Sequence, residues 1–214
     1  MRSLRQVPPG IDEDRQVRVT DLVLRSQEAA RLRTRVTAGL SGEVLEIGFG
    51  SGLNMPWYPP AVQRVRAVDP SAVARKLAAD RVAASTVPVE YIGADARALK
   101  LADASVDYVV SVLTLCTIPD VGRALAEIRR VLRPTGAFHF LEHGLSPQES
   151  VARWQHRLTP LQRRVFGGCH INRPIGRLVA GAGLELTRLD NYYLKGPRAF
   201  GYMFDGVATK PSGQ

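Results

Sequence analysis

Three glycines at alternate positions follow an apolar run near the start of the chain. Gly48, Gly50 and Gly52 come directly after Val44–Ile47 in the stretch VLEIGFGSGLN. Glycine lets a turn adopt positive φ angles and lets a ligand approach the backbone, because no Cβ stands in the way. A dinucleotide-binding turn follows the pattern G-x-G-x-x-G, whereas position 53 here is leucine. The turn therefore indicates a nucleotide-type cofactor without identifying it.

Two acidic residues end the next two strand-like segments. Asp69 follows Val65–Val68, and Asp95 follows Val89–Ile92. On an open parallel sheet both positions lie at the carboxyl edge, where ligands bind. Asp69 could accept hydrogen bonds from ribose hydroxyls there, and Asp95 could accept one from an adenine amine. The alternative for Asp69 is an N-cap with Pro70 at the first helical position, and Asp95 could be a cap or turn residue.

The elements that position these residues alternate along the chain. Strands are expected at 44–47, 65–68, 89–92, 106–112 and 137–141, and helices at about 11–40, 71–84 and 121–132. This order predicts an α/β, Rossmann-like fold, with a mostly parallel sheet and helices on both faces. LELTRLDNYYL and FGYMFDGVATK predict two final strands, an antiparallel pair at the C-terminal edge. We expect residues 1–10 to be loosely attached, 1–40 to form a helical cap, 41–145 the cofactor-binding core, and 146–214 acceptor-pocket elements with the last two strands.

Prolines modify two of the expected helices. Pro56, Pro59 and Pro60 follow the glycine turn, so the helix that usually starts there must be short, interrupted or displaced. This disfavours a dinucleotide enzyme, which would hold a diphosphate at that helix N-terminus. Further along, Pro160 predicts a break or kink within the segment 151–166.

The composition limits partners and compartment. The chain of 214 residues has 29 Lys and Arg against 20 Asp and Glu, a net charge of +9. Such a charge fits ordinary Arg-rich composition, peripheral contact with an anionic membrane, or nucleic acid. Aromatic residues are only 7% and do not alternate with basic ones, which disfavours nucleic acid. Cys116 and Cys169 show neither disulfide-framework nor zinc-ligand spacing, so no metal and a cytoplasmic location are expected.

Taken in order, these motifs resemble those of class I S-adenosylmethionine-dependent methyltransferases over about residues 43–145. The motifs are VLEIGFGSG, VRAVDPS, GADARALKLADASVDYVVS and EIRRVLRPTGAFHFLEH. LEIGFGSGLNMPWYPP, LTLCTIPD and GGCHINR are similar to the alkyl-thiol methyltransferase-like proteins. The resemblance to the quinone-biosynthesis and phosphatidylethanolamine methyltransferases is more distant. The resemblance implies S-adenosyl-L-methionine as cofactor.

The resemblance also implies the residues that hold this cofactor. They are Glu46, Gly48, Gly50 and Gly52 around the methionine part, Asp69 and Pro70 at the ribose, Asp95 and Ala96 at the adenine, and Ser111 to Leu113 through backbone atoms. Glu46 has two interpretations. Its carboxylate could meet the cofactor's ammonium, directly or through water, or it could accept hydrogen bonds from the amides of the glycine turn.

Methyl transfer from a sulfonium is an in-line displacement, so the protein must align the acceptor and, where needed, remove its proton. His143, after the fifth strand, is the candidate base. We expect a small, hydrophobic acceptor: a thiol, a phenol or quinol, or a lipid amine. The alternatives are an RNA methyltransferase and a non-catalytic S-adenosylmethionine-binding protein. The candidate pocket residues are Cys116, Glu142, His170 and Asn172.

Overall fold

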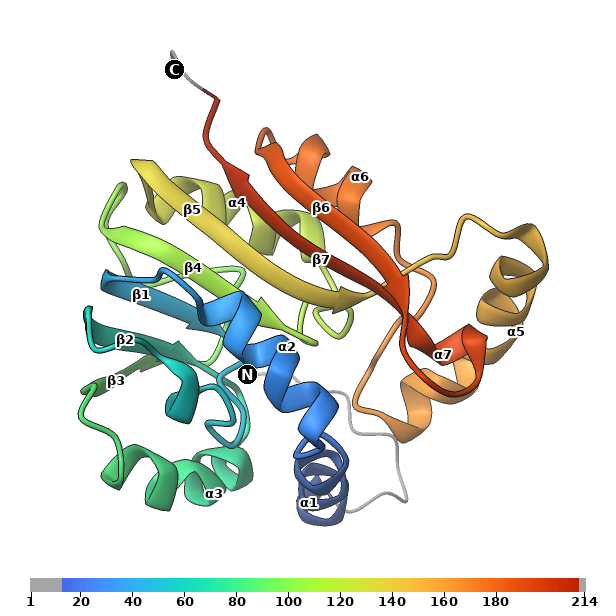
Figure 1. Ribbon diagram of the computed structural model, residues 1–214, viewed down its shortest axis with the longest axis horizontal. Coiled ribbons are helices and arrows are strands. Elements are labelled where there is room, and N and C mark those ends of the chain that lie inside the picture. Colours follow the sequence, from blue (N-terminus) through green and yellow to red (C-terminus); the bar gives the residue numbers. More distant parts are fainter. Residues whose placement is uncertain (1–12, 212–214) are drawn as a thin grey trace.

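A seven-stranded sheet forms the centre of the computed structural model, which describes residues 13–211 (Figure 1). The strand order is β3-β2-β1-β4-β5-β7-β6. The strands are β1 Gly42–Ile47, β2 Val62–Val68, β3 Val89–Gly93, β4 Val106–Val112, β5 Leu132–His143, β6 Glu185–Tyr193 and β7 Tyr202–Thr209. Strands β1 to β5 run parallel, and β7 pairs antiparallel with both β5 and β6. The predicted fold class is confirmed, while residues 1–10 lie outside the described range.

Helices cover both faces of this sheet (Figure 1). They are α1 Glu13–Val23, α2 Gln27–Thr37, α3 Ala72–Ala83, α4 Val121–Val131, α5 Glu149–Val165, α6 Ile175–Gly181 and α7 Arg198–Gly201. One apolar core joins α4 and α6 to the sheet, with Leu125, Ile128 and Ile175 fully buried. A second core on the other face includes Val36 of α2 and Ala78 of α3. Both faces of the parallel strands are therefore buried, which explains their nearly continuous apolar sequence.

The N-terminal segment differs from its prediction. The expected helix over 11–40 is, within the described residues, two helices separated at Leu24–Ser26. Ser26 is the N-cap of α2, and its hydroxyl accepts a hydrogen bond from the Ala29 amide at 3.2 Å. Serine is among the preferred N-cap residues because its oxygen satisfies an amide that has no partner within the helix. The apolar periodicity continued across this cap and concealed the break.

The prolines have different outcomes. After the glycine turn the structure has only the short 3₁₀ turn η1, Met55–Trp57, so the prediction of a short helix is confirmed. Pro160, by contrast, lies inside α5, which continues on both sides of it, so the break is wrong and the kink stays a prediction. The Pro160 ring is exposed, and nearby Thr159 donates a hydrogen bond to the Gln155 carbonyl at 2.7 Å. A solvent-facing ring costs one backbone hydrogen bond without displacing core contacts.

Strand β5 begins at Leu132, directly after α4, rather than at Ala137 as expected. It is the longest strand, with 12 residues, and it ends at His143. All five parallel strands end at the same edge of the sheet. The segments that follow them, the glycine turn among them, gather there (Figure 1). Within residues 13–211 no helix is long and apolar enough to cross a bilayer.

Candidate cofactor and acceptor site

The glycine turn after β1 requires left-handed backbone at all three glycines. The φ angles are +73° at Gly48, +57° at Gly50 and +73° at Gly52. A Cβ on Gly48 would lie 2.1 Å from Oγ1 of Thr114, so this glycine allows the loop after β4 to approach. A Cβ on Gly50 would have only a carbonyl oxygen at 3.8 Å near it. Gly50 therefore faces open space, where a ligand can reach the backbone.

Asp69, at the end of β2, is held against this turn. Its Oδ2 accepts a hydrogen bond from the Gly50 amide at 2.8 Å, and its Oδ1 accepts one from the Ser71 amide at 2.8 Å. Ser71 is the N-cap of α3 and Ala72 begins the helix, so the capping interpretation of Asp69 and Pro70 is wrong. Asp69 therefore lies with both oxygens at the glycine turn, and its binding of the ribose stays a prediction.

Asp95, after β3, is half-buried and paired with Arg97. Its two oxygens accept from the guanidinium at 2.9 and 3.0 Å, and Oδ1 also accepts from the Arg97 amide at 2.9 Å. The hydrogen bond from the Arg97 side chain is the main reason that the pKa of Asp95 lies below its usual value. Neighbouring Ala96 packs into the core. Asp95 is thus ionised and anchored, with acceptor capacity left on Oδ2.

Glu46, within β1, is buried behind the glycine turn. Its carboxylate accepts hydrogen bonds from Nδ2 of Asn54 at 2.7 Å and from the Tyr58 hydroxyl at 2.5 Å. Arg33 of α2 donates to Oδ1 of Asn54 at 2.6 Å. Burial raises the pKa of Glu46 to about 7, although both hydrogen bonds act against this rise. Side chains hold the carboxylate, so the interpretation in which it caps the amides of the turn is wrong.

Helix α1 also reaches the glycine turn, which the sequence patterns did not indicate. Asp21 of α1 accepts a hydrogen bond from the Ser51 hydroxyl at 2.5 Å. Arg81 of α3 lies 3.1 Å from the Asp21 carboxylate and donates to the Ser51 carbonyl at 2.6 Å. The three residues come from helices and a turn that lie far apart in the sequence. These contacts hold α1 against the turn.

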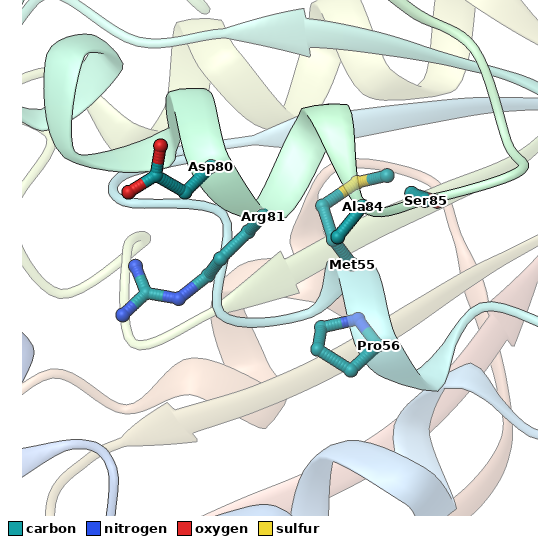
Figure 2. Close-up of a pocket in the computed structure, with 6 residues that line it drawn as sticks. All are labelled: Met55, Pro56, Asp80, Arg81, Ala84 and Ser85. Atoms are coloured by element: carbon teal, nitrogen blue, oxygen red, sulfur yellow. The ribbon is translucent and has the colours of Figure 1, made fainter.

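A hollow of about 280 Å³ lies beside this turn, between η1 and the end of α3 (Figure 2). Its lining residues are Met55, Pro56, Asp80, Arg81, Ala84 and Ser85. None of these is a predicted cofactor residue. The hollow therefore adds nothing to the cofactor site at the strand ends.

Glu142, near the end of β5, organises the loop after β4. Its carboxylate is fully buried and accepts from the Ser111 hydroxyl at 2.7 Å and from the Thr114 and Leu115 amides at 2.9 Å. It also accepts from the Cys116 amide at 3.3 Å. Burial raises the pKa of Glu142, and these hydrogen bonds oppose the rise. These four hydrogen bonds give the carboxylate an internal role, and its place in the acceptor pocket stays a prediction. In the same loop, Leu113 has a φ of +54°, which is unusual for a branched residue.

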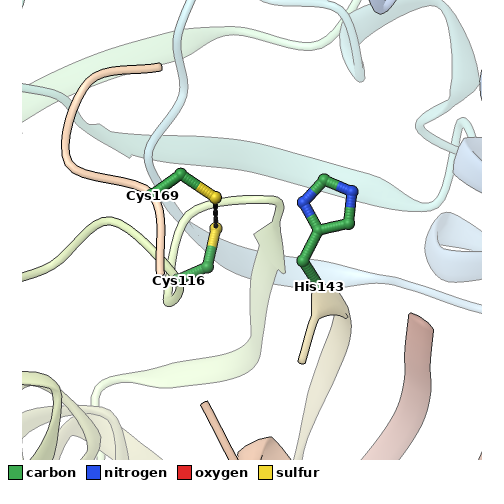
Figure 3. A group of neighbouring side chains, drawn as sticks. All are labelled: Cys116, His143 and Cys169. Carbon is green, nitrogen blue, oxygen red and sulfur yellow. Dashed lines mark hydrogen bonds between the residues drawn. The ribbon is translucent and has the colours of Figure 1, made fainter. Parts of the chain in front are cut away.

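Three soft donor side chains meet at this edge (Figure 3). Cys116 follows β4, His143 ends β5, and Cys169 belongs to the loop before α6; one donor atom from each lies within 4.8 Å of the other two. The two sulfur atoms share a hydrogen bond of 3.6 Å. The contact with Cys116, and then His143, lowers the pKa of Cys169 to about 5, while the pKa of Cys116 is raised well above its usual value. The spacing of these three residues along the chain did not predict a metal site, because only the fold brings them together.

The remaining predicted pocket residues lie on the same loop. The His170 amide donates to the Cys116 carbonyl at 2.8 Å, and its ring Nδ1 lies 3.2 Å from that oxygen. Burial lowers the pKa of His170. Asn172 contacts His156 of α5, with 2.9 Å between Nδ2 and Nδ1. His170 therefore borders the cysteine cluster, whereas Asn172 joins the loop to α5.

Comparisons with known proteins agree with this geometry. Residues 45–140 match the methyltransferase domain family. The thiol S-methyltransferase TMT1A of Homo sapiens is 33% identical over 177 residues, which cover 77% of this chain and 72% of that protein. The chain belongs to the S-adenosylmethionine-dependent methyltransferases. The thiol S-methyltransferase TMT1B of Rattus norvegicus is 39% identical over 158 residues, 71% of this methyltransferase but only 64% of the rat protein. The match thus spans about two thirds of these relatives.

The fold of this methyltransferase also has solved counterparts. Phosphoethanolamine N-methyltransferase 2 of Haemonchus contortus, in complex with phosphomonomethylethanolamine and S-adenosylhomocysteine, superposes with a TM-score of 0.73. It is 16% identical, and the match covers 99% of this chain and 61% of that one. At this identity the likeness concerns the fold alone.

S-adenosyl-L-methionine is the cofactor, as the resemblance implied, and the strand ends of this methyltransferase fit it. Gly50 leaves open space beside the turn. Asp69 and Asp95 stand at successive strand ends, and Asp95 has acceptor capacity left on Oδ2. When bound, the cofactor supplies the electrophilic methyl group, and the chain supplies orientation.

Proposed function

We propose that this methyltransferase transfers the methyl group to the sulfur of a small, hydrophobic thiol. The observation that carries the proposal is the similarity, at 33% to 39% identity, to thiol S-methyltransferases over about three quarters of this chain. Those names describe the relatives. The site supports the same acceptor chemistry here, in three respects.

First, the site favours a thiol over an amine. An ammonium acceptor needs a carboxylate with free acceptor positions, and Glu142 was the candidate from the sequence. Its carboxylate instead accepts four hydrogen bonds from the protein. A thiol acceptor needs no such carboxylate, because the nucleophile is its thiolate, which carries no positive charge to be bound.

Second, an apolar hollow borders the cysteine cluster. It has a volume of about 400 Å³ and lies between α5 and α7, with Trp154, Leu158 and Phe200 in its lining. Leu158 also packs against Cys116, Cys169 and Ile171. A hydrophobic acceptor in this hollow would therefore lie one side chain away from the two sulfurs.

Third, different segments of the chain are suited to hold the methyl donor and the methyl acceptor. In this proposal the segment 1–40 caps the cofactor through α1 and α2, and 41–145 holds it. Asp69 then binds the ribose, Asp95 and Ala96 flank the adenine, and Ser111 to Leu113 touch it through the backbone. The segment 146–214 supplies the acceptor hollow.

Helix α5 also exposes Trp154 and Leu161 beside arginines, which supports contact with an anionic membrane.

The test is an acceptor panel with S-adenosylmethionine and the full chain. We expect methylated alkyl thiols, with the rate rising with chain length, and little product from phenols, quinols or ethanolamine lipids. Product from a lipid amine or from RNA alone would replace the thiol assignment. Bound cofactor without any product would favour a non-catalytic binding protein. The matched control is Asp69→Ala, which should abolish product from every acceptor alike.

A further inference from the structure

The Cys116, His143 and Cys169 side chains converge from three segments that are otherwise separate in the sequence. Both cysteines are buried, with 1% and 5% of their surface exposed. The Nδ1 atom of His143 is also buried, and it has no hydrogen-bond partner among residues 13–211. Figure 3 shows the imidazole with one nitrogen turned toward the two sulfur atoms. A buried polar atom without a partner is costly, and a bound ion is one of the groups that can satisfy it.

The geometry of this cluster fits a tetrahedral metal. Two thiolates bound to Zn²⁺ at about 2.3 Å have their sulfur atoms roughly 3.8 Å apart. The Sγ atoms of Cys116 and Cys169 are 3.6 Å apart. All three donor atoms lie within 4.8 Å of one another, so a rotation of the His143 side chain would complete the coordination. Sulfur with imidazole is a soft ligand set that favours zinc over magnesium or calcium.

Two further side chains hold the loop that carries Cys116. Glu142 accepts a hydrogen bond from the Cys116 amide, and Arg173 donates to the Leu115 carbonyl from a buried position. Outer contacts of this kind orient the residues that bind a metal.

We propose that Cys116, His143 and Cys169 bind Zn²⁺ through two sulfurs and one imidazole nitrogen, and that the open fourth position takes the acceptor thiol as a thiolate. The second half rests on the proposed function. Sites with three protein ligands and an open position are typical of catalytic zinc, and a coordinated thiol is deprotonated. His143 is then a metal ligand rather than the base predicted from the sequence.

The transfer step balances without a further reactant. The acceptor thiol releases its proton to water when it binds. A sulfur lone pair forms the new C–S bond to the methyl carbon, while the C–S bond of the sulfonium breaks. The electron pair of the broken bond stays on the sulfur of S-adenosylhomocysteine, and the thioether leaves the metal. Glu142 aligns the two sides, because it accepts hydrogen bonds from both Ser111, in the cofactor segment, and the Cys116 amide.

The first experiment measures the metal itself, independently of catalysis. The full chain is purified with a phosphine reductant, and zinc content is measured before and after dialysis against a chelator and re-addition of zinc. Cobalt replacement should give sulfur-to-cobalt charge-transfer bands. We expect about one metal per chain, and a loss of more than about tenfold in metal affinity in Cys116→Ser, Cys169→Ser and His143→Ala. His156→Ala, an exposed histidine of α5, is the matched control and should retain the metal.

If a variant fails to fold, the reversible loss and return of metal in the unaltered chain still decides the matter. No stoichiometric zinc and no charge-transfer bands would overturn the proposal, as would isolation of the two cysteines as a metal-free disulfide.

The second experiment tests the open position. Propanethiol added to the cobalt-substituted protein should change the cobalt spectrum, and propanol, which lacks the sulfur, should not. An unchanged spectrum would overturn the thiolate assignment. A changed spectrum without methylated product would support the metal site while contradicting the proposed function, so the two failures are distinguishable.

Discussion

Glu46 makes the stability of the fold depend on pH. Burial raises its pKa from 4.5 to about 7 in the folded chain. The folded state therefore binds this proton more tightly than the unfolded state does. The stabilisation is fully present below about pH 4.5 and is lost as the pH rises through about 7, an effect of roughly 3 kcal/mol.

The corresponding prediction concerns Glu46→Gln without cofactor. The free energy of unfolding of the unaltered chain should fall by up to about 3 kcal/mol more between pH 5 and pH 8 than that of the variant. Urea unfolding at each pH measures it. Glu90→Gln, on the surface of β3, serves as control and should follow the unaltered chain. Parallel pH curves for the unaltered chain and Glu46→Gln would contradict the buried carboxylate as the cause.

Asp69 joins the glycine turn to the proposed ribose site through one carboxylate. Asp69→Asn keeps the shape but replaces one acceptor oxygen by a donor and removes the charge. Hydrogen bonds to charged groups contribute about 1.5–3 kcal/mol. We expect S-adenosylmethionine affinity to fall by about thirtyfold or more, measured by titration calorimetry. Asp103→Asn, at an exposed ion pair with Arg130, should leave the affinity unchanged, and equal affinities for the two variants would exclude the ribose assignment.

The residues of the site were predictable to different degrees. Gly50 and Asp69 could be predicted from the sequence. They follow adjacent parallel strands, and ligands bind at the carboxyl ends of such strands. The partners of Glu46 could not be predicted, since Asn54 and Tyr58 reach it through a turn shaped by prolines. The meeting of Cys116 with Cys169 depends on how the loop before α6 folds back, which no periodicity encodes.

At the scale of elements, the loop after β4 depends on β5. Glu142 accepts hydrogen bonds from three consecutive amides of that loop and from Ser111. In Glu142→Ala these buried donors lose their acceptor, which costs about 1–3 kcal/mol per group. We predict a loss of at least about 3 kcal/mol of unfolding free energy in urea.

The control for this prediction is Glu185→Ala, at the exposed start of β6, which should change stability by less than about 0.5 kcal/mol. If Glu142→Ala proved as stable as this control, the carboxylate would not be the anchor of the loop.

Strands were easier to predict than helices, for a physical reason. Strands such as β4 are buried on both faces and appear as unbroken apolar runs. Helix ends depend on single side chains. Ser26 begins a new helix although the apolar periodicity of the sequence continues through it. Pro160 does not end its helix, because the effect of a proline depends on whether its ring faces solvent or the core.

For the whole molecule, cofactor binding should appear as thermal stabilisation. A ligand at 100 times its dissociation constant adds about 2.7 kcal/mol. For a chain of this size, each kcal/mol raises Tm by about 2–4 °C, so we predict a rise of about 5–10 °C with S-adenosylmethionine. Differential scanning calorimetry measures it. Asp69→Asn at the same ligand concentration should show a much smaller rise, and a full rise there would mean that the ribose is held elsewhere.

The position of β7 means that the sheet is completed only late in synthesis of the chain. This strand lies between β5 and β6, although the ribosome makes it after both. Until it emerges, the long edge of β5 stays open and β6 has no neighbour, a state in which unpaired strand edges invite association with other chains. Asp205 of β7 is fully buried and hydrogen-bonds Arg188 of β6 at 2.7 Å. A nascent chain would therefore gain from a chaperone that shields β5 until this last insertion closes the sheet.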